Sequence, residues 1–149
     1  MNAVIIGCSN TKVRSGAPLP AIELYQGNTI PELRNVITGR PELRGRIFIL
    51  SGRYGVLGAD DPIEWYDHSL TLDEAISRQD ECDQALKAKF GQLGAYSEIL
   101  VLAAPTYFAM ISGILVWPDR PTIHWLPDPK RQWDIAKTIL SRWNWTRKP

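Results

Sequence analysis

Four short runs of apolar residues punctuate the chain, at residues 3–7, 46–50, 99–103 and 122–126. Each run is too short for a helix, and each is ended by Ser, Gly, Pro or Asp, residues that favour turns. Continuous apolar runs of this length are typical of parallel strands that helices cover on both faces. The pattern therefore predicts four buried strands.

Helical patterns lie between and after these runs, over residues 29–39, 71–90, 105–111 and 128–143. The first two begin with the spacing of a capping box, Thr29 with Glu32 and Thr71 with Glu74. The last begins with Asp128 at the N-cap position, followed by a proline. Strands that alternate with helices predict an α/β protein: a single domain over residues 1–149, folded as a three-layer α/β/α sandwich with a four-stranded, mainly parallel sheet.

Composition narrows the classes of function. No apolar run approaches the roughly 20 residues that cross a bilayer. The first ten residues lack the basic start and the apolar stretch of a signal peptide, so we expect a cytoplasmic protein with no membrane partner. The two cysteines, Cys8 and Cys82, form no CxxC pair, which excludes a disulfide scaffold and a zinc ribbon. With only two histidines as well, we expect no metal and no cofactor.

The net charge of +1 conceals blocks of opposite sign. Residues 1–57 carry a net charge of +4, residues 58–83 carry −8, and residues 120–149 carry +5. Such blocks can separate a surface that faces phosphates from one that faces solvent. For residues 73–83 the acidic outer face of an ordinary helix is the favoured interpretation.

Ligands bind outside the carboxyl ends of the strands in such sheets, so the loops that follow the four strands should meet at one edge. The first loop offers Ser9, Asn10 and Lys12. An amide can read a base edge or orient a water molecule, and a lysine can contact a phosphate. A loop in which Ser and Asn cap a helix fits the spacing equally well. Cys8 is interpreted as a small buried hydrophobe rather than as a nucleophile, since no histidine lies near it in sequence.

The loop after the second strand carries the residues best suited to chemistry. Arg53 can hold a phosphate or a carboxylate, and the glycines at 52, 55 and 58 let the backbone come close to a ligand. Tyr54 and Tyr66 offer faces on which a base can stack, a contact worth ~1–3 kcal/mol per base. Glu64 and Asp67 add two carboxylates.

The remaining polar and aromatic residues of these loops are either weaker candidates for substrate binding or are expected to have structural roles. Ser51, Tyr107 and Asp128, one from each of the later loops, are candidate substrate-binding residues. Trp65 is expected to pack on the core, because large aromatic side chains contribute most when they are buried. His68 is expected to lie at the surface rather than to act in catalysis.

The C-terminal helix mixes basic residues with tryptophans. Lys130, Arg131 and Arg142 among aromatic side chains are what a nucleic-acid surface requires. Trp133 and Trp143 fall on one helical face and are expected to join the core. Many ordinary surface helices have the same composition, so both interpretations of the basic residues stay open.

Three motifs in the first 70 residues resemble a known family. They are CSxxK (Cys8, Ser9, Lys12), LYxG (Leu24, Tyr25, Gly27) and ILSGRYGVL followed by IxxYD (Ile63, Tyr66, Asp67). Together they resemble the small bacterial and phage domain of unknown function that is related to the peroxide-stress protein YaaA. The resemblance adds Tyr25 to the candidate substrate-binding residues.

Two more distant similarities concern nucleic acid. Similar CSxxK and SxxG…Y patterns occur in the core domain of archaeosine synthase, which acts on a modified base. A four-stranded parallel sandwich is also the architecture of the uracil-DNA-glycosylase superfamily, which is an analogy at the level of the fold. The chain departs from that superfamily, since no DPY motif follows the first strand and no HPS loop follows the fourth.

The residues and the resemblance favour an enzyme that handles a nucleobase, most concretely an N-glycosidase that excises a modified base from DNA in phage defence or repair. Cleavage of the N-glycosidic bond builds positive charge on the sugar and negative charge on the departing base. Asp67, with Glu64 and Asp128 behind it, is the candidate carboxylate near the sugar, and Asn10 would hold the base or a water. Lys12 and Arg53 would neutralise phosphate or the leaving anion.

Two other classes of function stay open. A nucleic-acid-binding stress or defence module without catalysis would show strong salt dependence and would leave DNA unchanged. An enzyme that cleaves free nucleotides would use the same edge of the sheet. Neutralising Arg142 and removing residues 147–149 separates these classes, because both changes should weaken binding of a polymer and barely affect a free nucleotide.

Overall fold

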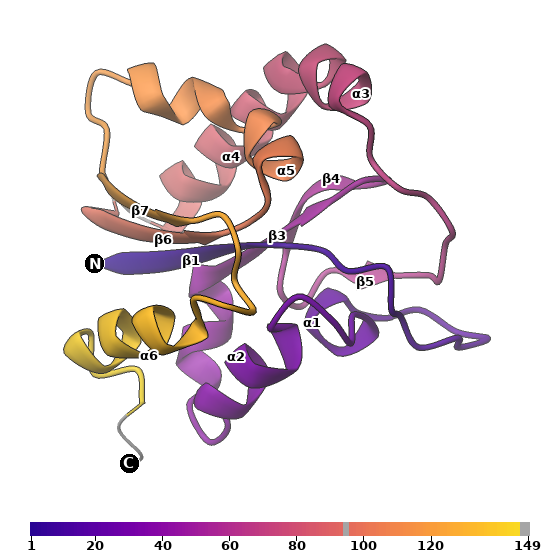
Figure 1. Ribbon diagram of the computed structural model, residues 1–149, viewed down its shortest axis with the longest axis horizontal. Coiled ribbons are helices and arrows are strands. Elements are labelled where there is room, and N and C mark those ends of the chain that lie inside the picture. The colour runs from indigo at the N-terminus through magenta and orange to yellow at the C-terminus, as the bar shows by residue number, and fades with distance from the viewer. Residues whose placement is uncertain (94–95, 147–149) are drawn as a thin grey trace.

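The computed structural model describes residues 1–93 and 96–146 of the chain. At its centre is a five-stranded sheet in the order β4-β3-β1-β6-β7, with helices on both faces (Figure 1). The strands are β1 (Asn2–Gly7), β3 (Ile47–Ser51), β4 (Gly55–Gly58), β6 (Glu98–Leu102) and β7 (Thr122–Leu126). All neighbouring strands are parallel except β3 and β4. The predicted α/β class with a mainly parallel sheet is confirmed, with five strands in place of four.

The additional strand, β4, comes from a segment whose glycines were expected to approach a ligand. Gly55 has a φ of 77°, a left-handed conformation that favours glycine, and it turns the chain back on itself. The chain then runs antiparallel to β3, with Ser51 opposite Gly55 and Phe48 opposite Gly58. Gly55 and Gly58 therefore belong to a strand of the sheet and not to the loop that was expected.

The apolar strand β1 contributes side chains to two buried clusters, one on each face of the sheet. Val4 and Ile6 belong to one buried cluster, Ala3 and Ile5 belong to the other, and all four side chains are fully buried. Successive side chains of a strand point to opposite faces, so a strand covered on both sides is apolar at every position. The strands β3 and β6 lack polar alternation for the same reason, whereas the edge strand β7 alternates polar Thr122 and His124 with apolar residues and is only partly buried.

The helices form the two outer layers. The layer beside Val4 and Ile6 contains α1 (Ala21–Leu24), α2 (Ile30–Val36), the 3₁₀ helix η1 (Pro41–Arg46) and α6 (Trp133–Arg142). The opposite layer contains α3 (Leu72–Ser77), α4 (Gln79–Leu93), α5 (Pro105–Ala109) and the 3₁₀ helix η2 (Ser112–Val116). A small antiparallel pair, β2 (Leu19–Pro20) with β5 (Pro62–Ile63), lies beside α1. Within the described residues, no helix has the length and apolar character needed to span a bilayer.

One of the two predicted capping boxes is present. Thr71 Oγ1 accepts the backbone N–H of Glu74 at 3.2 Å, and the Glu74 carboxylate accepts the Thr71 N–H at 3.2 Å. The long helix expected after it is instead two helices, α3 and α4, which meet at Arg78. The box at Thr29 is wrong, because the Thr29 backbone is left-handed (φ 66°) and its hydroxyl donates to Asn28 O.

The last helix begins later than expected. Asp128 precedes a turn, in which its backbone N–H donates to Gln132 Oε1 at 2.8 Å, and α6 begins only at Trp133. Trp133 and Trp143 pack against the core as predicted. Trp145 then lies fully buried at the amino end of the sheet. Trp145 donates to Asn2 Oδ1, so the last described residues lie near the first strand. The start of β1 and the end of α6 lie on the same side of the molecule in Figure 1.

Candidate functional site

An open cleft lies at the carboxyl ends of β1 and β6. Its volume of about 380 Å³ falls in the range of small-ligand sites. The lining residues come from four segments that are distant in sequence: Cys8, Ser9, Asn10, Thr11, Gly27, Asn28, Ala104, Tyr107 and Lys130. A second hollow of about 290 Å³ shares Gly27, Asn28 and Lys130 with the cleft and extends to Glu32 and Trp133. The prediction that the loops after β1, β6 and β7 meet at one edge is confirmed.

The loop after β1 is held in place by the hydrogen bonds of Ser9 and by the close approach of Gly27 to Ser9. Ser9 Oγ donates to Thr11 O at 2.7 Å and accepts the backbone N–H of Gly27 at 3.0 Å. A Cβ on Gly27 would lie 2.9 Å from Ser9 Cβ, closer than such atoms pack, so only glycine fits. This contact explains the glycine of the LYxG motif. Neither Ser9 nor Asn10 precedes a helix, so the helix-capping interpretation of this loop is wrong.

Asn28 is a residue of the cleft that the sequence did not single out. Its side-chain amide donates to Gly7 O at 2.7 Å and to Leu102 O at 3.5 Å, so it joins the ends of β1 and β6. Its backbone is left-handed (φ 53°), which asparagine tolerates better than most residues. Within the described residues Asn28 Oδ1 has no hydrogen-bond partner, so it offers the cleft an acceptor. The Gly-Asn pair is a turn signal, but only the fold shows which strands it contacts.

Three candidate substrate-binding residues form a buried hydroxyl network. The Tyr25 and Tyr66 hydroxyls are 2.6 Å apart, and the Tyr66 hydroxyl is 2.9 Å from Ser51 Oγ. Burial raises the pKa of Tyr25 and of Tyr66, and nearby Cys8 acts in the same direction. Lys12 Nζ lies over the Tyr66 ring, 4.4 Å from its centroid. The structure thus gives these residues a supporting position behind the surface in place of the ligand contact expected from the sequence.

Tyr54 and Arg53 lie in the turn between β3 and β4, at the same edge of the sheet. Their backbone N–H groups donate to Ser51 Oγ at 3.0 and 3.2 Å. The Tyr54 ring packs edge-on against Tyr66, with centroids 5.4 Å apart, and is 36% exposed. Arg53 is exposed, with its guanidinium 5.6 Å from the Tyr54 ring centroid. Of the two predicted stacking residues, Tyr54 therefore has accessible surface and Tyr66 supports it.

The two candidate carboxylates, Asp67 and Glu64, are exposed and lie on the segment between β5 and α3. Neither lines the cleft. Two residues after Asp67, the Ser69 hydroxyl donates to Asn10 Oδ1 at 3.4 Å, so this segment borders the cleft. No hydrogen bond or ion pair joins Glu64 to a cleft residue within the described part of the chain. The Ser69 contact places the chain just after Asp67 at the rim, so Asp67 is closer in sequence to the cleft than Glu64 is.

Two neighbours of these carboxylates have surface positions. Trp65 is half-buried, and the Arg14 guanidinium lies over its ring, 4.1 Å from the centroid. The partner that covers Trp65 is thus a cation of the first loop, where the sequence led us to expect the core. His68 donates from Nε2 to the Glu74 carboxylate at 2.7 Å and is partly exposed, as expected for a surface residue.

The predicted basic residues divide between the two ends of the sheet. Lys130 lines the cleft, and within the described residues it makes no hydrogen bond or ion pair. Arg131 beside it is exposed, 3.6 Å from the carboxylate of Asp128. Arg142 lies at the far end of α6, where it donates to Glu98 Oε2 at 2.9 Å, at the start of β6. Lys130 and Arg142 therefore cannot contact the same small ligand.

Cys8 and Tyr107 meet where β1 approaches α5. Burial raises the pKa of the Tyr107 phenol, and the Cys8 side chain within hydrogen-bonding reach adds to this shift. Cys8 is 8% exposed and free, as expected for a small buried residue. Both histidines of the chain, His68 and His124, bind carboxylates elsewhere, so no histidine base activates this thiol.

The chemistry of the cleft follows from its lining. Within residues 1–93 and 96–146, no group of three or more His, Cys, Asp or Glu side chains is placed to hold a metal ion. None of the nine lining residues is acidic, and amide, hydroxyl and ammonium groups supply the polar surface. Such a surface suits a neutral or anionic ligand that both donates and accepts hydrogen bonds. Residues 147–149, which the sequence suggested for polymer binding, lie outside the described residues.

The sequence of the chain also matches a protein family. Residues 3–121 match the sequence profile of a family of unknown function, DUF6884. This span contains every residue that lines the cleft except Lys130. A search of curated proteins finds no match to the chain.

Proposed function

The chain belongs to the DUF6884 family, whose function is unknown, and we propose that it is a DNA N-glycosidase that excises a modified base. The observation that carries the proposal is the chemistry of the cleft. It combines the Asn28 acceptor with the Lys130 ammonium and contains no acid among its lining residues. A nucleobase edge presents donors and acceptors together, and excision leaves negative charge on the base. A cleft without carboxylates favours that charge.

The resemblance noted in the first 70 residues supports the same function. The motif residues Cys8, Ser9 and Gly27 line the cleft, and Lys12 and Tyr25 lie directly behind it. Two of the three motifs that resemble the YaaA-related domain thus contribute residues to the cleft lining, which supports the proposal. Archaeosine synthase acts on a modified base in nucleic acid, which is the substrate class proposed here.

The base is proposed to enter the cleft after leaving the DNA stack. Duplex DNA hides its glycosidic bonds, so an enzyme that cleaves them must extrude the nucleotide. In the cleft, Asn28 Oδ1 accepts a hydrogen bond from a base N–H, and Asn10 binds the base edge or a water. Tyr54 stacks at the rim, where its ring is accessible. Arg53 and Arg131, exposed at the same edge, contact the flanking phosphates.

The bond between C1′ and the base nitrogen then breaks, and its electron pair leaves with the base. Lys130 stabilises the negative charge on the base, and Asp67 at the rim stabilises the positive charge on the sugar. A water molecule attacks C1′, and its proton passes to Asp67 or to solvent. This mechanism requires no metal and no organic cofactor.

The test uses the whole chain and several DNAs, including phage DNAs that carry modified bases. Released bases are identified by mass spectrometry, and abasic sites are counted on the same samples. The proposal predicts a released base with an equal number of abasic sites. It also predicts that Asn28→Ala and Lys130→Gln reduce this release, whereas Lys137→Gln on the outer face of α6 leaves it unchanged.

Two other results would contradict the proposal. DNA binding without a released base would make the protein a binding module. Cleavage of free nucleotides without any action on polymers would make it a nucleotide hydrolase.

A further inference from the structure

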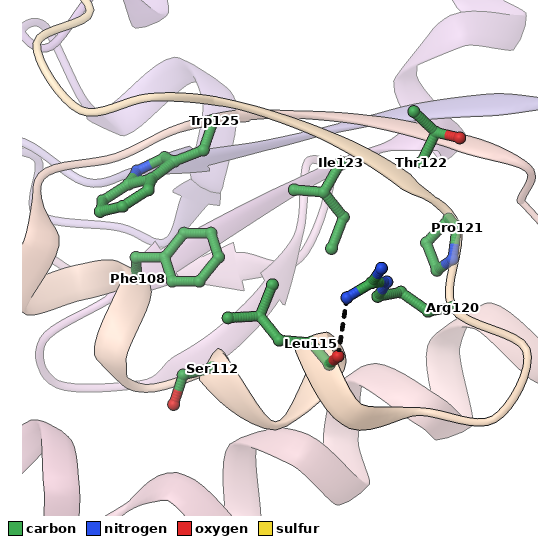
Figure 2. A pocket seen from close by; sticks show the side chains of 8 residues that line it. All are labelled: Phe108, Ser112, Leu115, Arg120, Pro121, Thr122, Ile123 and Trp125. Carbon is green, nitrogen blue, oxygen red and sulfur yellow. Dashed lines mark hydrogen bonds between the residues drawn. The ribbon is translucent and has the colours of Figure 1, made fainter.

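A second groove lies along β7, the outermost strand of the sheet, on the face that carries α5 and η2 (Figure 2). Its volume is about 590 Å³, larger than that of the cleft. Figure 2 shows the rings of Phe108 and Trp125 at one end and the Arg120 side chain at the other, with Leu115 and Ile123 between them. The groove therefore has an apolar body and one cationic end.

Two large apolar side chains in the wall of the groove are exposed to solvent. Trp125 is 41% exposed and Leu115 is 44% exposed. The Phe108 ring, only 6% exposed, packs against the Trp125 ring at 4.6 Å between centroids and supports it from within the groove. Single exposed apolar residues are common, but several that line one concave surface indicate a binding site.

Two neutral polar groups of the groove are already bonded within the protein. The Trp125 indole N–H donates to Ala103 O at 2.8 Å, and Ser112 Oγ donates to Ala109 O at 3.1 Å. These hydrogen bonds help to hold the walls of the groove in place.

Arg120 differs from these groups. It donates one N–H to Leu115 O at 3.0 Å and has no carboxylate partner within the described residues. A guanidinium has five N–H donors, so several remain for a ligand.

We infer that this groove binds a small amphipathic anion, with a flat body of two or three rings and one carboxylate, sulfonate or phosphate at its end. The rings lie against Trp125 and Leu115, and the anionic group meets Arg120. The length supports a small molecule: from Pro121 to Trp125 a strand rises about 13 Å. The groove shares no lining residue with the cleft, so this inference stands independently of the proposed glycosidase activity.

The test uses two dyes of similar shape and different charge. Anilinonaphthalene sulfonate has aromatic rings and one anionic group, and phenylnaphthylamine is its uncharged counterpart. Fluorescence titration of the whole chain should show one sulfonate dye bound per molecule, with about tenfold tighter binding than the uncharged dye. Amide chemical shifts should change along β7 and α5.

Three variants make the test specific. Arg120→Gln, at an exposed position, should weaken binding of the sulfonate dye about tenfold and leave the uncharged dye unaffected. Leu115→Ser should weaken both dyes, and Lys137→Gln, which removes an equal charge from α6, should change neither.

Three results would overturn the inference. The first is equal binding of the two dyes, and the second is binding of the sulfonate dye by Arg120→Gln as tight as by the natural chain. The third is a dimer, seen in sedimentation, that the dye dissociates. The dimer would make a second copy of the chain the occupant of the groove.

Discussion

The amino ends and the carboxyl ends of the parallel strands use their polar side chains in different ways. At the amino ends several of these side chains bind one another, although the buried Tyr96 hydroxyl has no hydrogen-bond partner among the described residues. Asn2 Oδ1 accepts the Trp145 indole N–H at 2.8 Å, and the Glu98 carboxylate accepts His124 Nε2 at 2.6 Å and Arg142 at 2.9 Å. These contacts join the first strand, the last two strands and the C-terminal segment.

At the carboxyl ends, several polar groups have no partner in the described part of the chain. In the cleft these include Asn28 Oδ1, Asn10 Nδ2, Thr11 Oγ1 and the Lys130 ammonium. Half-buried polar groups are normally satisfied, so the free Oδ1 of half-buried Asn28 indicates a ligand site, and the exposed Lys130 ammonium is available to the same ligand. The comparison teaches that one end of the sheet stabilises the fold and that the other is available for binding.

Trp145→Ala should have the largest effect on stability. Trp145 is 1% exposed, and removal of a buried aromatic ring costs about 3–5 kcal/mol. Urea unfolding measures the loss. Trp125→Ala is the matched control, because Trp125 is 41% exposed and should cost less than half as much. Equal losses from the two variants would mean that the amino end is not the stabilising one.

Asp67→Asn should have the largest effect on chemistry. The change preserves the shape of the side chain and removes its charge and its capacity to accept a proton. We expect base release to fall by about 10²–10⁴-fold with DNA affinity nearly unchanged, as measured by single-turnover assays. Glu64→Gln should have a much smaller effect, because Glu64 lies five residues before Ser69, which contacts the cleft, whereas Asp67 lies only two residues before it. Full activity of Asp67→Asn would remove Asp67 from the mechanism.

Ser51→Ala tests the hydroxyl network that lies behind the cleft. Ser51 is fully buried and its Oγ contacts the Tyr66 hydroxyl and the N–H groups of Arg53 and Tyr54. Loss of these partners should reduce the free energy of unfolding by about 1–3 kcal/mol. Unchanged stability in urea would show that the network contributes nothing to the turn.

Alkaline pH should destabilise the carboxyl end through its buried phenols. The pKa of Tyr66 is raised by burial, so its contribution to stability is complete below the ordinary tyrosine pKa of about 10 and is lost as pH rises towards the higher folded value. Tyr66→Phe removes this group. Between about pH 10 and 11, its free energy of unfolding should fall less steeply than that of the natural chain, by up to ~1.4 kcal/mol per pH unit. Parallel slopes would contradict the assignment.

The sequence predicted the features that depend on local pattern. Three strands, β1, β3 and β6, are buried as their continuous apolar runs predict, and the fourth, β7, is a strand but is buried only at Leu126. The capping box at Thr71 follows from its spacing with Glu74. The edge at which the loops meet follows from the rule for parallel sheets. Each of these signals resides in a few neighbouring residues.

The features that depend on contacts between distant segments could not be predicted. Asn28 lies in the cleft because β1 and β6, whose ends it contacts, are neighbours in the sheet. Arg142 lies far from the cleft because α6 runs back to the amino end of the sheet. Tyr66 looks accessible in the sequence, yet Lys12 covers its ring. Gly55 was expected in a ligand loop because its left-handed turn and a binding loop require the same residue type.

The most direct test of the contrast between the two ends is a comparison of Lys130→Gln with Arg142→Gln in DNA binding at fixed salt. Both variants remove one positive charge from the C-terminal segment, but only Lys130 lines the cleft. We predict that Lys130→Gln weakens binding about tenfold and that Arg142→Gln leaves it within about twofold of the natural chain. Weaker binding by Arg142→Gln with unchanged binding by Lys130→Gln would place the DNA at the amino end and contradict the assignment of the cleft.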